Sequence, residues 1–87
     1  MKYQSYDLGR LQGGEIIEIT LSGNSANVKL MDSSNFLNYK AKRKHTYYGG
    51  HVIRSPYKIS VPSSGKWYIT IDMGGYVGSV SSSIRIL

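Results

Sequence analysis

Apolar and polar residues alternate along most of this chain, which is the pattern of a β-strand with one buried and one exposed face. In residues 15–21, Ile17 and Ile19 fall on one side of the chain, while Glu18 and Thr20 fall on the other. The same period of two recurs in four further stretches, residues 26–31, 57–61, 66–73 and 78–86. The pattern therefore predicts an all-β fold with these inward side chains buried: Ile17, Ile19, Val28, Leu30, Ile59, Val61, Trp67, Ile69, Ile71, Ile84 and Ile86.

Segments rich in glycine and polar residues separate the predicted strands. Gly23-Asn24, between residues 15–21 and 26–31, favours a tight hairpin because these residue types accept a positive φ. Asp7-Leu8-Gly9 is expected to end a short opening strand at residues 3–6. Five to seven mainly antiparallel strands at this spacing are typical of a small β-sandwich or a partly open barrel. We predict one such domain over residues 1–87.

One segment, residues 32–51, lacks the alternation and reads DSSNFLNYKAKRKHTYYGGH. Asp32, Ser33 or Ser34 is expected to cap a short helix there, with basic residues near its C-terminal end, where the helix dipole favours them. The alternative is one long ordered loop. Connections of this length in compact domains are usually functional when they are ordered, so this segment is the first place to look for a site.

Composition adds an uneven distribution of charge. Eleven Lys/Arg against five Asp/Glu give a net charge of +6, and the pI is about 9.7. No acidic residue occurs between Asp32 and Asp72, whereas seven Lys/Arg lie in that interval. An excess of this kind favours an anionic partner, such as nucleic acid, a phosphorylated small molecule or a membrane headgroup. A solvated rim that only maintains solubility is the alternative.

Other features of the composition exclude whole classes of chemistry. The sequence has no cysteine, which excludes disulfide bonds, a thiolate nucleophile and a cysteine metal cage. The first residues contain no apolar stretch of the kind that begins a secretory signal. No apolar run approaches the roughly 20 residues that a spanning helix needs. We therefore expect a cytoplasmic protein without a membrane span.

Three long stretches of the chain resemble a small bacterial family. They read LxxGxxIEITLSGNSANVKLMDSSNFLNY, RKHTYYGGHVIRSP and VPSSGKWYITIDMGGYVGSVSSSIRIL, and together they cover almost the whole sequence. The family they resemble is the domain of unknown function numbered eighteen-eighty-three. The resemblance implies a compact all-β fold in a protein that is found alone or joined to TIR-type signalling domains, where a sensing role would suit it. It implies no established activity and no functional residue.

The strongest candidate for a functional site is the sequence YKAKRKHTYYGGH at residues 39–51. Its cations can neutralise phosphates, its aromatic faces can stack on bases, and its two glycines let backbone amides approach a ligand. We expect Arg43 to be the strongest single contact, because a guanidinium can hold a phosphate with two parallel hydrogen bonds. The predicted ligand-binding residues, expected to converge on one concavity, are Tyr39, Lys42, Arg43, Lys44, His45, Tyr47, Tyr48, His51 and Arg54.

Other chemistry has weaker support. His45, His51 and Asp32 are metal-binding residue types, but their spacing matches no metal motif. A Ser/His/Asp trio built on Ser33 or Ser34 lacks the GxSxG turn that exposes a serine nucleophile. We therefore predict a non-enzymatic binding or accessory module for an anionic small molecule, with no catalytic residue, metal or cofactor. Two alternatives stay open: a nucleic-acid-binding protein that uses the same loop, and a structural unit that forms homo-oligomers through strand edges.

Overall fold

The computed structural model describes residues 3–74 and 78–87, and this part of the chain forms seven strands and one short helix. The predicted all-β class is confirmed, and each of the five predicted strands is present with ends displaced by one or two residues. The elements are β1 (Tyr3–Leu11), β2 (Ile16–Gly23), β3 (Ala26–Asp32), α1 (Ser33–Lys40), β4 (Tyr48–Val52), β5 (Tyr57–Ser60), β6 (Gly65–Asp72) and β7 (Val80–Ile86).

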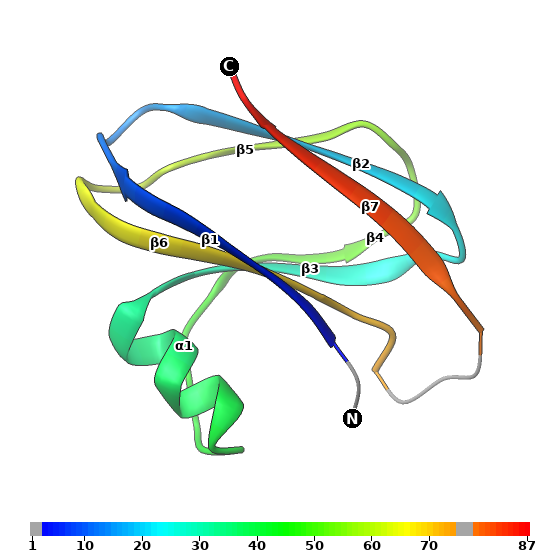
Figure 1. Cartoon of the computed structure of the whole chain (residues 1–87), viewed down its shortest axis with the longest axis horizontal. Helices are drawn as coiled ribbons and strands as arrows, with labels where there is room; N and C mark the ends of the chain where they lie inside the picture. The colour runs from blue at the N-terminus through cyan, green and yellow to red at the C-terminus, as the bar shows by residue number, and fades with distance from the viewer. Residues whose placement is uncertain (1–2, 75–77) are drawn as a thin grey trace.

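The strands form two antiparallel sheets that pack face to face. The four-stranded sheet has the order β1-β6-β3-β4, and the three-stranded sheet has the order β5-β2-β7. Figure 1 shows the two sheets as separate layers, with α1 on the outer side of the four-stranded sheet. The sheets are not closed into a barrel, so the sandwich rather than the barrel is the observed architecture. The main apolar core lies between the layers and includes Ile17, Ile19, Val28, Leu30, Ile69 and Ile71.

Most of the expected core side chains are buried, and the exceptions belong to the smaller sheet. Ile59 on β5 and Ile84 on β7 are only half-buried, because these two strands are the edges of the three-stranded sheet. The prediction for Ile86 was wrong, since this side chain is 38% exposed. It lies at the last position of β7, opposite Ile17, where the covering layer ends.

The tight hairpin predicted at Gly23-Asn24 is also wrong, because β2 and β3 belong to different sheets. Gly23 does have a positive φ of 103°, but the turn carries the chain from one layer to the other. It is held to β7 instead: the Asn24 amide donates to the Ser79 carbonyl at 3.0 Å. The period of two identifies strands and their buried faces, but it does not say which strands pair.

Two strands, β1 and β4, differ from the sequence prediction, and in both cases the reason involves a glycine. β1 continues to Leu11 instead of ending near Tyr6, because the register shift between Asp7 and Gly9 is a bulge that bends the strand without ending it. β4 lies in the segment where no strand was expected. A side chain at Gly49 would collide with the carbonyl of Val28, so glycine is what lets β4 pair with β3.

Tyr3 and Leu87, the first and last described residues, lie on opposite sides of the sandwich. Tyr3 begins β1 on the α1 side, where its ring centroid is 5.1 Å from that of Tyr39. Leu87 follows β7 and donates its amide to the Ile16 carbonyl at 2.9 Å, on the three-stranded sheet. Figure 1 shows the C-terminus on the far side of the molecule from α1. Among the described residues, no helix is long and apolar enough to cross a membrane.

Candidate functional site

The short helix α1 begins where strand β3 ends. The Asp32 carboxylate accepts a hydrogen bond from the Asn35 amide at 2.9 Å, so Asp32 is the N-cap among the three candidates that the sequence offered. The same oxygen also accepts from the Asn35 side chain at 3.0 Å. Because Asp32 is both the last residue of β3 and the cap of α1, the sheet itself fixes where the helix starts.

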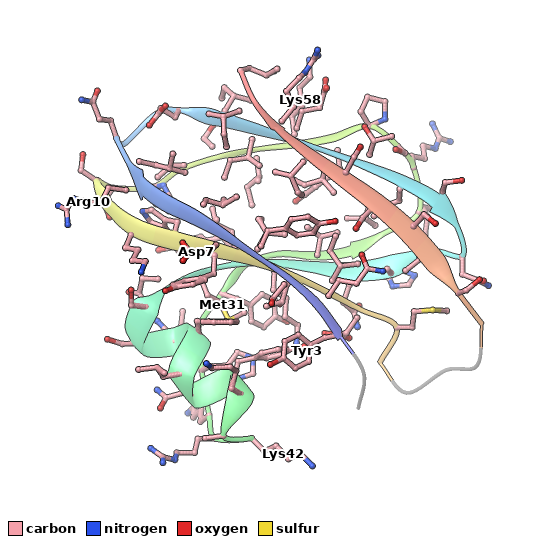
Figure 2. All side chains as sticks on the ribbon, viewed as in Figure 1. Tyr3, Asp7, Arg10, Met31, Lys42 and Lys58 are labelled. Carbon is pink, nitrogen blue, oxygen red and sulfur yellow. The ribbon has the colours of Figure 1, made fainter. Side chains whose placement is uncertain are left out.

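One side of α1 packs on the outer face of the four-stranded sheet. The Phe36 ring stacks on Tyr68 of β6, with 4.2 Å between ring centroids and 14° between ring planes. Met31 and Tyr39 are buried in the same small cluster. Figure 2 shows Met31 and Tyr3 between the sheet and the helix. In contrast, Leu37 points away from the sheet and is 60% exposed.

A buried carboxylate on β6 anchors the C-terminal half of the helix. Asp72 accepts hydrogen bonds from the Asn27 side chain at 2.9 Å, the Tyr39 hydroxyl at 2.8 Å and the Gly74 amide at 2.9 Å. The Lys29 ammonium lies 3.8 Å from the same carboxylate. These three hydrogen bonds and the nearby positive charge compensate for the burial of the Asp72 carboxylate, which would be costly without them.

The surroundings of Asp72 and Tyr39 determine the protonation states of these two side chains. Burial by itself raises the pKa of Asp72, but the hydrogen bonds from Asn27, Tyr39 and Gly74 and the charge of Lys29 outweigh it and hold that pKa below its usual range. Burial raises the pKa of Tyr39, and the hydrogen bond to Asp72 raises it further. Near neutral pH the carboxylate is therefore ionised and the phenol keeps the proton that it donates.

Aromatic rings and Lys29 hold the connection between α1 and β4 against the sheet. The Lys29 ammonium lies 5.0 Å from the centroid of the Tyr39 ring and 4.8 Å from that of Tyr47. The His45 ring lies between the same two tyrosines, at 5.1 and 5.7 Å between centroids. The Thr46 amide adds a hydrogen bond of 2.7 Å to the Asn35 side chain. These contacts hold the segment that follows α1 in a defined position against the sheet.

The C-terminal end of α1 adopts the Schellman arrangement, with an unusual residue at its key position. The Lys42 amide donates to the Tyr39 carbonyl at 3.1 Å, and the Arg43 amide donates to the Asn38 carbonyl at 2.8 Å. Lys42 occupies the left-handed position with φ of 60° and is the one non-glycine residue with positive φ among the described residues. Glycine is the usual residue here, because a side chain is strained in this conformation.

Four cations surround this helix end, and we call them the basic tip: Lys40, Lys42, Arg43 and Lys44. All four are exposed. The three ion pairs found among residues 3–74 and 78–87 involve other cations, namely Lys29, Lys66 and Arg85. Figure 2 shows Lys42 at the end of the molecule opposite Lys58, with Arg10 on a third side.

The structure does not bring all nine predicted ligand-binding residues together. Lys42, Arg43 and Lys44 lie in the basic tip, and the rings of Tyr39, His45 and Tyr47 lie beneath it. His51 is on the same face of the sheet but further along β4, with its Nδ1 3.4 Å from the Asn27 side-chain oxygen.

The two remaining residues do not join this group. Tyr48 pairs with Leu30 and points to the opposite face of β4, where its ring lies 6.2 Å from that of Trp67. Arg54 lies beyond the far end of β4, beside a small cavity of about 50 Å³. The single concavity that the sequence predicted is therefore not formed by these residues.

Sequence reasoning missed the residues that position the tip. In the alternating pattern, Lys29 is an outward residue of the predicted strand 26–31, and Asp72 is a polar residue near the end of the predicted strand 66–73. The one signal available was that each is charged within a strand whose other residues are mostly apolar. Lys40 belongs to the tip as well, although it was not among the predicted binding residues; its ammonium lies 4.8 Å from the centroid of the Phe36 ring.

Two other kinds of site have less support in this structure. A cavity of about 350 Å³ opens between β1, β6 and the start of β7, and the described residues that line it include Asp72 but no Lys, Arg or His. It is therefore unsuited to an anion. No group of three metal-ligating side chains occurs within the described ranges. The Asp32 carboxylate serves as the helix cap, and the His45 Nδ1 lies 3.0 Å from the Arg43 carbonyl.

The comparisons with known proteins agree with the resemblance seen in the sequence. No curated protein and no solved structure gives a significant match. A family model, in contrast, matches residues 1–87. The chain therefore belongs to the family described as Domain of unknown function (DUF1883).

Proposed function

We propose that this protein is a non-enzymatic binding module that recognises phosphate-bearing anions through the basic tip of α1. The observation that carries the proposal is the position of Lys42 at φ of 60°, among three further cations that have no carboxylate partner in residues 3–74 and 78–87. A side chain in this conformation costs about 1 kcal/mol relative to glycine. A lysine at this position therefore supports a role for its charge outside folding.

The helix dipole alone does not explain four cations. A cation in the last turn stabilises a helix by about 0.3–1 kcal/mol, and the benefit falls off beyond that turn. Lys40 lies in the last turn of α1, whereas Arg43 and Lys44 lie beyond the cap. They also make no ion pair among the residues described, so neither is explained by local electrostatics.

The arrangement determines which anions it suits. The four cations lie at the C-terminal end of α1, where Figure 2 shows Lys42 projecting from the molecule, and none of them lines the two cavities described above. An exposed group of point charges with one guanidinium fork suits several phosphates presented side by side more than one enclosed phosphate. This favours a nucleotide polyphosphate chain or an array of phosphates as the ligand.

A binding measurement with matched charge removal tests the proposal. We expect the full chain to bind ATP and single-stranded DNA at low salt, and the double variant Arg43→Ser/Lys44→Ser to lose at least about tenfold in affinity. The control is Arg10→Ser/Lys58→Ser, which removes the same charge from exposed positions elsewhere on the molecule. Equal losses in both variants would mean that only net charge matters. No binding by the parent protein would mean that the tip is a solvated surface.

Nucleic acid is a second candidate, favoured by Tyr47. This ring is 42% exposed beside the tip and is held in place by Lys29, so it offers one face to a base. Stacking on an aromatic ring contributes about 1–3 kcal/mol per base. If a single strand is the ligand, Tyr47→Ala weakens its binding but leaves the binding of inorganic triphosphate, which has no base, unchanged. A strand neutralised at four phosphates also gives a log–log salt slope of about −2.8, steeper than that of a nucleotide.

A further inference from the structure

Leu37 lies next to the basic tip and belongs to neither of the two apolar clusters found in the described residues. It occupies the outward side of α1 together with Ser34 and Ala41, because Phe36 and Tyr39 face the sheet. Its side chain is 60% exposed, although leucine is normally a core residue. A single exposed leucine is ordinary by itself. What makes this one informative is that four cations follow it closely in the chain: Lys40 lies in the last turn of α1, and Lys42, Arg43 and Lys44 lie just beyond its end.

The outward side of α1 presents apolar and positive groups and no negative one. The helix sequence SSNFLNYK contains no acidic residue. The nearest carboxylate in sequence, Asp32, lies at the opposite end of the helix and is bonded to Asn35. Asp72, on the sheet beneath, is buried and bonded. The exposed Asp7 carboxylate, opposite Tyr68 on the outer face of the sheet, lies 3.7 Å from the Lys66 ammonium. A planar negative surface that approaches the tip therefore meets cations and a leucine, and α1 itself presents no carboxylate to repel it.

We propose, resting on the function proposed above, that the phosphates recognised by the basic tip are those of an anionic lipid bilayer, into which Leu37 inserts. The tip binds the headgroup phosphates, and the leucine enters the boundary between headgroups and acyl chains. This is binding to the surface by a projecting helix end. The combination of charge and an aliphatic side chain at one convex end favours a lipid surface over nucleic acid, for which a leucine offers neither stacking nor a hydrogen bond.

Vesicle binding by the full chain tests this directly. We expect the protein to co-sediment with vesicles of phosphatidylcholine containing about one third phosphatidylglycerol, and not with pure phosphatidylcholine. Leu37→Ser should lower the partition onto the anionic vesicles by about tenfold, because one buried leucine side chain is lost. Arg43→Ser/Lys44→Ser should lower it by more than tenfold.

A matched control distinguishes insertion of Leu37 from general stickiness. Ile53 is more exposed, at 74%, but lies beyond the far end of β4 from the tip. Ile53→Ser should therefore leave the partition unchanged. In Leu37→Trp, indole emission should shift to the blue on anionic vesicles and stay constant with soluble glycerol phosphate, while unfolding midpoints confirm that the variants fold.

The outcomes separate this inference from the function on which it rests. Tip-dependent binding of ATP or single-stranded DNA without vesicle binding would overturn the lipid proposal and leave the anion-binding function standing. Vesicle binding that depends on the tip but is the same for Leu37→Ser and the parent protein would overturn insertion. Absence of binding to vesicles, ATP and DNA alike would overturn both proposals.

Discussion

The two ends of α1 follow different rules. At the N-terminal end, the Asp32 carboxylate caps the helix, and Phe36 stacks on Tyr68 of the sheet. At the C-terminal end, Lys42 holds a left-handed conformation and the neighbouring cations have no carboxylate partner among the described residues. The interactions at the N-terminal end all stabilise the fold. The C-terminal end gives up stability for an exposed charge, which is the property expected of a binding surface.

The largest loss of stability that we expect comes from a substitution in the sheet beneath both helix ends, and the other predictions can be compared with it. Ile69 is fully buried between the layers, whereas its neighbour Tyr68 is half-buried under the helix. Ile69→Ala should lower the free energy of unfolding by about 2–5 kcal/mol, through lost transfer energy and a cavity. Tyr68→Ala should lower it less. Urea denaturation of both variants checks this, and equal losses would contradict the assignment of the inner face.

The next effect breaks the anchor under the C-terminal end. Asp72→Asn removes the charge that pairs with Lys29 and one of the acceptor oxygens that the carboxylate supplies. We expect a loss of about 2–3 kcal/mol in unfolding free energy, because Lys29 and the Tyr39 hydroxyl are left poorly paired. Fluorescence-monitored denaturation gives the value. A change below about 0.5 kcal/mol would mean that the helix end is held by its aromatic contacts alone.

Acid should weaken the same anchor. The pKa of Asp72 is held below its usual range in the folded protein, so the unfolded chain takes up the proton first as the pH falls. The stability that Asp72 contributes is complete above about pH 5, and it is lost as the pH falls through about 4 toward the folded pKa. Asp72→Asn lacks this dependence. Denaturation from pH 6 to pH 3 should therefore show a steeper fall for the parent protein than for the variant.

A smaller effect tests the N-terminal end. Asp32→Ala removes the cap of α1 and should lower the unfolding free energy by about 1 kcal/mol. Asp32→Asn is the matched control, because asparagine caps a helix almost as well without the charge. Chemical denaturation separates the two. A loss of the same size in both variants would show that the charge of Asp32, rather than its hydrogen bond, stabilises this helix end.

The smallest expected effect has the opposite sign and belongs to the C-terminal end. Lys42→Gly relieves the strain at φ of 60° and should raise the unfolding free energy by about 0.5–1 kcal/mol. The same variant removes one tip cation, so anion binding should weaken while stability increases. Thermal unfolding and an ATP titration measure the two quantities. A variant that is both less stable and unchanged in binding would remove the contrast between the two helix ends.

The sequence predicted the strands where one face is apolar, and it failed where backbone geometry decides. The alternation in residues 15–21 and 66–73 located β2 and β6 closely. β4 has two adjacent glycines, which carry no pattern, although Gly49 is the residue that permits its pairing with β3. The connection at Gly23 has the residue types of a hairpin turn. It crosses between the two layers nevertheless, because β2 pairs with β7 and not with β3.

The candidate site was predictable in its charge and not in its support. The absence of acidic residues between Asp32 and Asp72 pointed to the segment that forms the tip. Contacts among Lys29, Tyr39 and Asp72 join β3 and α1 to β6, which lies much further along the chain, and no local sequence pattern predicts them. Tyr48 was grouped with the tip by nearness in sequence, but successive strand residues face opposite sides of a sheet.

The position of Leu87 determines how the protein can be attached to a support. The last residue, Leu87, lies on the three-stranded sheet, on the far side of the molecule from α1. An affinity tag or a sensor-chip linkage attached after Leu87 therefore leaves the basic tip facing the solution. In contrast, Tyr3, the first described residue, lies beside Tyr39 of α1, the helix whose end carries the tip. C-terminal immobilisation is thus the orientation in which the protein is free to meet a surface.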